Sequence, residues 1–537
     1  MTRPVLMTLS APLLAWGVLA LVLIFMHGPV PLYSTRTLAV AWEMWDQGSW
    51  LVPLFNGVPY SHKTPLLPWL IHAGWLVGGV NDIWPRLLMV LLGTTAITQA
   101  GVLAGRLYPA RPKLPALTAW AMAGFWFFFL FSLQIMYELP LTVAVLAGLL
   151  ALCRRQGQAW VPWWPGLALA IGFGLLAKGP VALLHLGVPL LTARWWHPLA
   201  RDDGGRFAKN TLLANLAGIG MFALWLIPVL TLGKPEYREA LLVTQTAGRI
   251  RDSFDHAKPL WWYAPILMVL MAPWWWSRWW WGQVPALWRD ADNRFAWCWL
   301  AGMVLAFSLI SGKQPYYLLP AFPAFALLLA KAADARPRLG IAAPMLVVLA
   351  GIAMLGGRYI AAIIGKPFPS ELLFTMPVAG AVLVLLGIAL LRWRSLPLHA
   401  FGVLLGMATL YASVTPLTRA RFELSPTAKV IGDAQRDGHQ AAYLGIYQLQ
   451  FHFAGRLQAP LHVFDEGAAR AWAERHPAQL LVVNTLDPWT APGPQPLIQQ
   501  PFRFRWIQVW QAGQWRALPA QQLPLQAGAG ELNSQPR

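Results

Sequence analysis

Apolar stretches long enough to cross a lipid bilayer recur along this chain from near its N-terminus to about residue 416. Because an α-helix rises about 1.5 Å per residue, roughly twenty apolar residues cross the hydrocarbon core. Charges and turn residues separate about thirteen such stretches, which predicts a mostly α-helical, polytopic membrane bundle. The predicted spans are residues 9–26, 86–107, 114–132, 139–153, 164–178, 179–195, 211–232, 260–279, 295–311, 315–332, 338–356, 371–391 and 398–416.

The balance of apolar and charged residues excludes a water-soluble globule. Of the 537 residues, 57% are hydrophobic and 12% are charged, which leaves too little polar surface to face water. The 32 Trp residues agree with this, since indole rings favour the headgroup region of a membrane. A net charge of +19 suits nucleic acid in a soluble protein, but here the basic residues orient the spans, so we expect membrane lipids and no nucleic acid as partners.

Basic residues gather in every second loop between the predicted spans. With the N-terminus in the cytoplasm, each inner loop is basic, which is the positive-inside pattern. An odd number of spans then places residues from about 418 onward on the outer face, which is the periplasm for a bacterial inner membrane. The basic inner-loop residues are Arg106, Arg111, Lys113, Arg154, Arg155, Arg194, Arg201, Arg206, Lys209, Arg278, Arg289, Arg294, Lys331, Arg336, Arg338, Arg392 and Arg394.

Two long outer segments and a terminal domain complete the predicted organisation. The outer segments are residues 27–85 and 233–259; the first contains Leu66 to Val80, an apolar stretch too short to span comfortably, which predicts interfacial helices. We expect a membrane domain at 1–418, a small soluble α/β domain at 419–521 and a disordered tail at 522–537. Within the soluble domain the predicted elements are helices near 426–437 and 466–475, strands near 441–445, 460–464 and 479–484, and a hairpin near 503–517.

A few ionisable residues sit at the outer ends of the predicted spans, where charge is costly and indicates function. One acid among several bases suits a phosphate-linked lipid: cations hold the phosphate and the carboxylate contacts a proton or a sugar. The alternative is that these basic side chains only extend to the lipid headgroups at the membrane surface and have no part in a binding site. The residues concerned are His62, Lys63, Glu138, Lys178, Arg249, Arg251 and Lys313.

Short motifs in a fixed order extend this interpretation. They are Arg36 followed by Ala41-Trp42-Glu43-Met44, Trp50-Leu51-Val52-Pro53, Asn56-Gly57-Val58-Pro59-Tyr60 with Lys63 and Pro65-Leu66-Leu67, Glu138-Leu139-Pro140-Leu141-Thr142, Leu176-Ala177-Lys178-Gly179-Pro180, Pro259-Leu260-Trp261-Trp262-Tyr263, and Lys313-Gln314-Pro315-Tyr316-Tyr317-Leu318-Leu319-Pro320. Together they resemble the aminoarabinose transferase and protein O-mannosyltransferase group of GT-C glycosyltransferases. The span count and the terminal domain are also similar to those of the lipid A aminoarabinose transferases.

The resemblance implies an inverting transfer of a sugar from a polyprenyl-phosphate donor to lipid A or another envelope glycolipid at the outer leaflet, with a protein acceptor as the variant. It implies that Lys63, Lys178 and Arg249 hold the donor phosphate and that Glu138 orients the acceptor or the sugar. Lys313 and Tyr316 would line the same cavity, and Arg36 and Tyr60 belong to the matching motifs. We expect the enzyme to be a monomer.

One departure from the family pattern concerns the catalytic carboxylate. In the family an acidic pair precedes the Arg that matches Arg36, whereas Pro31 to Thr35 contain no carboxylate. General-base catalysis contributes roughly 10²- to 10⁴-fold, so a replacement is needed, and Glu43, Asp46 and Glu138 are the candidates. Glu43 lies two helical turns from Arg36, on the same face, although it also suits an ordinary interfacial helix. A phosphate acceptor, already an anion, needs less help from a base.

Three histidines suggest a metal site. Some aminoarabinose transferases bind zinc between the three regions that here carry His62, His256 and His452, and imidazole is a competent zinc ligand. The rival functions are a non-catalytic relative that keeps only the lipid-phosphate pocket, and a transporter. The absent acidic pair favours the first rival, whereas the lack of an inverted repeat speaks against the second.

Overall fold

The computed structural model describes residues 3–153, 162–233, 235–239, 241 and 257–518 of the chain. The chain divides into two compact units. Unit 1 comprises residues 1–26, 61–70 and 83–414, and unit 2 comprises residues 27–60, 71–82 and 415–537. The predicted tail at 522–537 lies outside the described residues.

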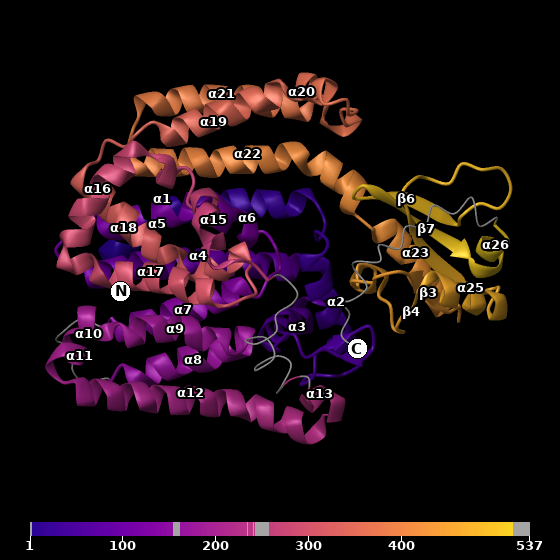
Figure 1. Cartoon of the computed structure of the whole chain (residues 1–537), viewed down its shortest axis with the longest axis horizontal. Helices are drawn as coiled ribbons and strands as arrows, with labels where there is room; N and C mark the ends of the chain where they lie inside the picture. Colours follow the sequence, from indigo (N-terminus) through magenta and orange to yellow (C-terminus); the bar gives the residue numbers. More distant parts are fainter. Residues whose placement is uncertain (1–2, 154–161, 234, 240, 242–256, 519–537) are drawn as a thin grey trace. The chain divides into compact units, whose positions relative to one another are not determined.

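Unit 1 is built from helices that lie lengthwise beside one another (Figure 1). In chain order they are α1 (Arg3–Met26), α4 (Ile83–Leu107), α5 (Leu114–Ala123), α6 (Trp126–Ser132), α7 (Glu138–Leu152), α8 (Trp164–Lys178), α9 (Val181–Leu191), α10 (Ala193–Trp196), α11 (Pro198–Asp202), α12 (Gly204–Leu232), α13 (Pro235–Glu239), η2 (Leu260–Trp262), α15 (Tyr263–Leu270), η3 (Trp274–Trp276), α16 (Arg278–Arg289), η4 (Ala291–Asn293), α17 (Arg294–Leu309), η5 (Pro315–Ala321), α18 (Phe322–Ala335), α19 (Ala342–Leu355), α20 (Gly357–Ile363), η6 (Ser370–Leu372) and α21 (Thr375–Arg392). Helices α3 (Leu66–Gly78) and α22 (Leu396–Phe422) contribute residues to both units.

Each predicted span falls on helical segments, so the helical class is confirmed. By length and composition, six helices in the described part of the chain are able to cross a membrane, or eight if two bent pairs are single spans. The remaining predicted spans fall on shorter helices, and the count of about thirteen stays a prediction. Residues 260–279 were wrongly predicted as one continuous helix: α15 ends at Leu270, where the run Met271 to Pro273 interrupts the helical ladder before η3.

Local chemistry explains where several helices stop. Helix α8 ends at Lys178 because Gly179 adopts a φ of +68°, a conformation that favours glycine, and Pro180 follows as the N-cap of α9. This is the break predicted at Gly179-Pro180. Helices α5 and α6 form a bent pair, with an angle of 66° between them at Gly124 and Phe125.

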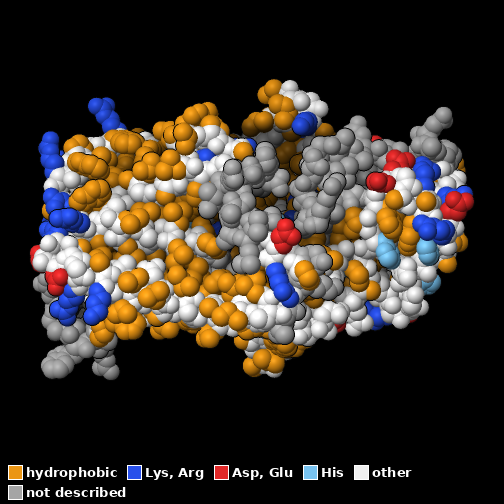
Figure 2. Space-filling model, turned by 60° about the horizontal axis from the view of Figure 1, so that its bottom comes forward, with side chains coloured by type: hydrophobic (Ala, Val, Ile, Leu, Met, Phe, Trp, Pro, Cys, Tyr) orange, Lys and Arg blue, Asp and Glu red, His pale blue; other side chains and the backbone are white. Residues whose placement is uncertain are grey.

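Figure 2 shows the surface character of unit 1. Hydrophobic side chains cover much of its visible flank, whereas Lys and Arg gather at the end formed by α10, α11 and the start of α12. An apolar flank with a basic end fits a bundle inserted in a bilayer.

Unit 2 is an α/β layer structure around a five-stranded sheet, so the predicted C-terminal α/β domain is present. The strand order is β4-β3-β5-β7-β6, with β3 parallel to β4 and β5, and β7 antiparallel to β5 and β6. Its elements are α2 (Tyr33–Asp46), β1 (Leu54–Phe55), β2 (Val58–Pro59), α23 (Ser425–Arg436), β3 (Ala441–Leu444), α24 (His452–Gly455), β4 (His462–Phe464), α25 (Glu466–Arg475), β5 (Leu480–Thr485), β6 (Ile498–Phe502), β7 (Arg505–Gln511) and α26 (Ala512–Arg516).

Both faces of the sheet are buried. Strand β5 shows how: Leu480 and Val482 pack in the core shared with α2 and α23, whereas Leu481 and Val483 pack in the core shared with α25 and α26. Successive side chains of a strand point to opposite faces, which is why β5 reads as an unbroken apolar run.

The predicted hairpin near 503–517 was placed too late in the chain. The hairpin is β6–β7, with Phe502 opposite Arg505, and residues 512–516 form the short helix α26 instead. The β6 sequence Ile-Gln-Gln-Pro-Phe carries a proline and two glutamines, so it resembles a loop. Pro501 is tolerated because β6 is an edge strand, where one N–H is not needed for pairing.

Much of the first outer segment folds into unit 2. Three residues of α2, Ala39, Val40 and Met44, lie in the same core as Ala428 and Ile431 of α23. The sequence had grouped this segment with the membrane domain, and the predicted boundary at 418/419 stays a prediction. Unit 2 is therefore assembled from segments that are remote in sequence.

Candidate functional site

An ion pair joins α7 to α8 at the ends of both helices. The Nζ atom of Lys178 lies 2.5 Å from Oε1 of Glu138, with the two side chains 17% and 5% exposed. Glu138 is the first residue of α7 and Lys178 is the last residue of α8. An acid at a helix N-terminus and a base at a C-terminus are each stabilised by the helix dipole, so both charges are placed favourably.

Two tyrosines of η5 flank the same ammonium group. Lys178 Nζ lies 4.9 Å from the ring centre of Tyr317 and 5.5 Å from that of Tyr316. A cation over an aromatic ring is attracted by the negative face of the ring. Tyr316 was predicted to line the site; Tyr317 was not singled out, although it stands in the quoted motif.

Lys63 joins this cluster from the first outer segment. Its Nζ lies 4.9 Å from the ring centre of Tyr137, the residue before Glu138. The next residue, Thr64, is the nearest side chain to the position that a Cβ would take on Gly179, at 3.9 Å. Lys63, Glu138 and Lys178 are therefore neighbours, as the predicted lipid-phosphate site requires. We call Lys63, Tyr137, Glu138, Lys178, Tyr316 and Tyr317 the outer cluster.

Lys313, also predicted to contact phosphate, makes a different set of contacts. Its side chain is buried, and its Nζ donates to the carbonyl oxygens of Lys258 at 2.9 Å and Ile310 at 2.5 Å. The backbone of the same two segments pairs as well, through Lys258 N to Ser311 O at 3.1 Å. Lys313 thus ties the chain before η2 to the end of α17.

Glu43 lies in unit 2 with both carboxylate oxygens occupied. Oε1 accepts the backbone N–H of Asn56 at 2.9 Å, and Oε2 accepts that of Gly57 at 2.8 Å. Burial raises the pKa of the Glu43 carboxyl from its ordinary 4.5 to about 7, although the two N–H donors act to lower it. A buried acid that titrates near neutrality is of interest chemically, but its oxygens already have partners.

Asn56 and Gly57 form the turn between β1 and β2, with φ values of +53° and +80°. Two positive φ values in a two-residue hairpin loop define a type I′ turn, for which Asn-Gly is the preferred sequence. The Asn56 side chain also bonds the backbone of Leu461, donating to its O at 2.8 Å and accepting from its N at 2.9 Å. Glu43 and Leu461 hold the turn from two sides.

Arg36 and Tyr60 are also placed in unit 2. The Arg36 guanidinium donates to the Oε1 atom of Gln448. Tyr60 is largely buried, and its ring centre lies 5.1 Å from that of Phe55. These two predicted contacts of the lipid phosphate are thus both in contact with other residues of unit 2.

The predicted zinc ligands are distributed differently. His452 is buried in unit 2: its Nδ1 lies 2.7 Å from the hydroxyl of Tyr447, and its Nε2 lies 3.7 Å from Glu43 Oε1. His62 belongs to unit 1, and His256 and Arg249 lie outside the described residues. Among the described residues no group of three or more His, Cys, Asp or Glu side chains is placed to hold a metal ion.

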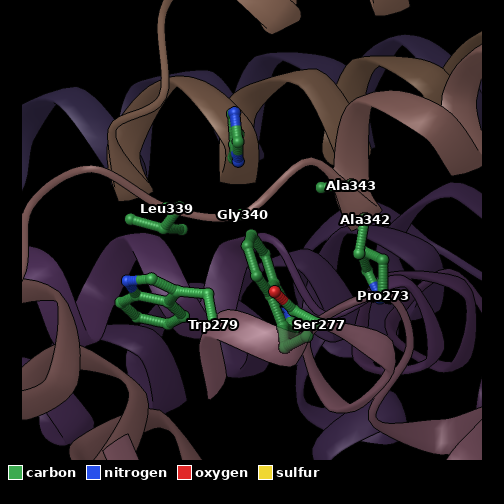
Figure 3. Close-up of a pocket in the computed structure, with 9 residues that line it drawn as sticks. Pro273, Ser277, Trp279, Leu339, Gly340, Ala342 and Ala343 are labelled. Carbon is green, nitrogen blue, oxygen red and sulfur yellow. The ribbon is translucent and has the colours of Figure 1, made fainter. Parts of the chain in front are cut away.

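A hollow of about 210 Å³ in unit 1 shares no lining residue with the outer cluster. Figure 3 shows Ser277 and Trp279 approaching it from one segment, and Leu339, Gly340, Ala342 and Ala343 from another. Pro273, Trp274 and His399 complete the lining. None of these described lining residues was predicted as part of a site.

Comparison with known proteins gives relatives in sequence and in structure. No protein-family model matches the chain. It is 27% identical over 333 residues to the undecaprenyl phosphate-alpha-4-amino-4-deoxy-L-arabinose arabinosyl transferase 2 of Pseudomonas fluorescens, which covers 60% of this chain and 55% of the relative. It is 28% identical over 344 residues to the corresponding transferase of Pseudomonas aeruginosa (strain LESB58), covering 62% and 61%. The chain thus matches less than two thirds of the length of these relatives.

The fold is that of ArnT from Cupriavidus metallidurans. The crystal structures of that protein bound to undecaprenyl phosphate and in the apo state superpose with TM-scores of 0.72 and 0.73, at 18% identity. Each comparison covers 96% of this chain and 99% of the other.

Proposed function

Because the chain is a relative of the undecaprenyl-phosphate aminoarabinose transferases and has the ArnT fold, we propose that it transfers a sugar from a polyprenyl-phosphate donor to lipid A or another envelope glycolipid. The transfer takes place at the outer leaflet of a bacterial inner membrane. The single observation that supports it most is the outer cluster, where Lys63 and the Glu138–Lys178 pair lie together at helix ends.

The outer cluster acts by electrostatic stabilisation in this scheme. In an inverting transfer, an acceptor oxygen forms a bond to the anomeric carbon while the bond from that carbon to the donor phosphate oxygen breaks. The lipid phosphate leaves with the extra negative charge. Lys63 and Lys178, with Arg249, hold that phosphate and stabilise the charge as it develops. Hydrogen-bond donors that bind the charge developing in the transition state lower the barrier more than donors that bind only the ground state.

Glu138 has two proposed tasks in this scheme. It fixes Lys178 by the 2.5 Å ion pair, and it orients the acceptor or the sugar. If the acceptor is a phosphate group, the attacking oxygen is already an anion and no base is required. The proposed catalytic role of Glu43 is harder to reconcile with its two backbone N–H partners, which favour a positioning role.

The remaining predicted contacts stay proposals. Arg36, Tyr60 and Lys313 are proposed to contact the lipid phosphate or line its cavity, together with Tyr316. A zinc site of His62, His256 and His452 is proposed on the family resemblance. For His452 a zinc ligand would have to be Nε2, because Nδ1 is taken by the Tyr447 hydroxyl. The monomeric state and the periplasmic position of the terminal domain are proposed in the same way.

A comparison of two ion-paired lysines tests the proposal. Lys331 resembles Lys178 in its contacts: it pairs with Asp290 at 3.1 Å, and its Nζ lies 4.4 Å from the ring centre of Tyr108. Wild type, Lys178→Met and Lys331→Met are expressed in a strain that lacks the gene, and lipid A is measured by intact mass. We expect the wild type to add a sugar mass, Lys178→Met to abolish it, and Lys331→Met to retain it.

Two outcomes would contradict transfer by this site. One is lipid A, and every other envelope glycolipid, of unchanged mass in the deletion strain; the chain would then be a non-catalytic binder of lipid phosphate. The absence of a carboxylate from Pro31 to Arg36 is the observation that favours this second function. The other is equal loss of product in both variants at equal protein levels, which would show that the loss is not specific to the outer cluster.

A further inference from the structure

The tip of the β6–β7 hairpin carries the most exposed large hydrophobic side chain of the described residues. Phe504 is 93% exposed, between Arg503 and Arg505. Arg503 has a φ of +59°, and the pair Phe502 and Arg505 closes the turn. A single exposed phenylalanine is ordinary on a protein surface, so its place and its neighbours have to decide what it does.

The hairpin tip is attached to the end of α22. The backbone N–H of Arg503 donates to the carbonyl of Arg421 at 2.8 Å, and Gln500 Nε2 donates to the carbonyl of Glu423 at 2.8 Å. In Figure 1, β6 and β7 accordingly lie beside the C-terminal end of α22. The tip therefore shares the level of the last turn of that helix.

The sequence of α22 indicates where this helix leaves the bilayer. It belongs to one of the six helices that are long and apolar enough to cross a membrane. From Ala400 to Thr418 it carries no charged residue, and then Arg419 and Arg421 follow. Basic residues directly after an apolar span lie in the headgroup region. The tip with Phe504 is held at that level.

The two segments that meet at the tip are basic. Arg503 and Arg505 flank Phe504 in the sequence, and the end of α22, which the Arg421 guanidinium ties to Arg503 O at 3.5 Å, carries Arg419 and Arg421, with Glu423 as its one acid. A hollow of about 190 Å³ lies against Arg419, Phe422 and Glu423 on one side and residues 27–31 on the other. Guanidinium groups bind phosphate oxygens in pairs, and phenylalanine favours the boundary of headgroups and acyl chains.

We propose that Phe504 and these four arginines form a lipid anchor: Phe504 enters the bilayer surface, and the arginines bind the phosphates of anionic phospholipids around it. The anchor fixes unit 2 to the leaflet at which α22 ends. It does not depend on the proposed sugar transfer. A lipid surface is favoured over a second copy or another protein because the apolar run of α22 ends at this tip and because the charges around it are basic.

The test uses the full chain with one spin label. Cys153 and Cys298 are the two cysteines, both free, and are replaced by Ser. A nitroxide is placed by Phe504→Cys and, as the matched control, by Leu497→Cys, which is 57% exposed just before β6, at the other end of the same strand. Collision rates with oxygen and with a water-soluble nickel chelate are measured in nanodiscs of phosphatidylcholine, with and without phosphatidylglycerol.

We expect the ratio of oxygen to nickel collisions to be several-fold higher at 504 than at 497, and to rise further with phosphatidylglycerol. Arg419→Gln with Arg505→Gln should remove the rise. A ratio at 504 equal to that at 497 in both discs would overturn the proposal. Low collision rates with both reagents would overturn it in favour of a protein contact, and a rise reproduced by inorganic phosphate in phosphatidylcholine discs would overturn it in favour of free anions.

Discussion

The carboxylate of Glu43 closes on the backbone of Gly57, with Oε2 accepting its N–H at 2.8 Å. The partner oxygen accepts the N–H of Asn56 in the same turn. A side chain that accepts hydrogen bonds from two successive N–H groups of a tight turn stabilises that turn.

Replacing Glu43 by Gln should destabilise unit 2. The amide offers one acceptor oxygen, so one of the two turn N–H groups is left facing an NH₂ group. The expected loss is about 1–3 kcal/mol for an unsatisfied buried donor. Thermal unfolding of the purified protein in detergent measures it, with Asp46→Asn as the control on the same helix. Equal midpoints for Glu43→Gln and wild type would contradict the role assigned to the turn.

The contribution of Glu43 to the free energy of unfolding should depend on pH in a defined direction. Its pKa is raised from 4.5 to about 7, so the stabilisation is full below pH 4.5 and is lost as the pH rises through about 7. His452 opposes this: burial lowers its pKa from 6.5 to about 3, so its contribution is lost as the pH falls from 6.5. His452 is present in both proteins, so the part of its contribution that does not depend on Glu43, whose Oε1 lies 3.7 Å from His452 Nε2, cancels in the difference between wild type and Glu43→Gln.

That difference is the quantity to measure. We expect the gap in unfolding midpoint between wild type and Glu43→Gln to be widest near pH 4.5 and to narrow up to about pH 7. A gap that widens over this range would mean that Glu43 is ionised in the folded protein at low pH.

The Glu138–Lys178 pair should show strong coupling. Removing one partner leaves a largely buried charge alone, which costs about 2–5 kcal/mol, towards the lower end here because Lys178 is 17% exposed. Glu138→Gln and Lys178→Met should each lower the unfolding midpoint, and the double variant should recover part of the loss. None of the three should modify lipid A. Full modification by the double variant would exclude the pair from the site.

Lys313→Met separates two roles for that residue. The buried ammonium bonds the carbonyls of Lys258 and Ile310, so its loss should cost about 1–3 kcal/mol and lower the unfolding midpoint. Lys366→Met, at an exposed position, is the control. If Lys313 instead binds the lipid phosphate, undecaprenyl-phosphate binding should weaken at an unchanged midpoint.

The sequence was most informative where one physical requirement dominated. Apolar length located the helices of unit 1, and the break at Gly179 followed from residue type alone. The motif resemblance to the aminoarabinose transferases was confirmed by relatives and by the fold. The strand predicted near 479–484 likewise coincides with β5, Leu480–Thr485.

Long-range partners were not predictable from one sequence. Nothing local in Glu43 says that it binds a turn thirteen residues later, and Lys313 looks like a phosphate ligand until the carbonyls of Lys258 and Ile310 are seen around it. Tyr137 and Tyr317 were missed as neighbours of Lys63 and Lys178 because aromatic residues are frequent in a membrane helix bundle.

Assembly of unit 2 from residues 27–60, 71–82 and 415 onward sets a schedule for biosynthesis. A ribosome adds roughly 5–20 residues per second, so α2 waits roughly 20 to 80 s for α23 to be synthesised. During that interval the apolar side of α2, with Ala39, Val40 and Met44, has no sheet to cover it. Newly made chains therefore have to be shielded by a chaperone or by the lipid surface, and a ribosome that stalls before residue 415 leaves a product open to proteases.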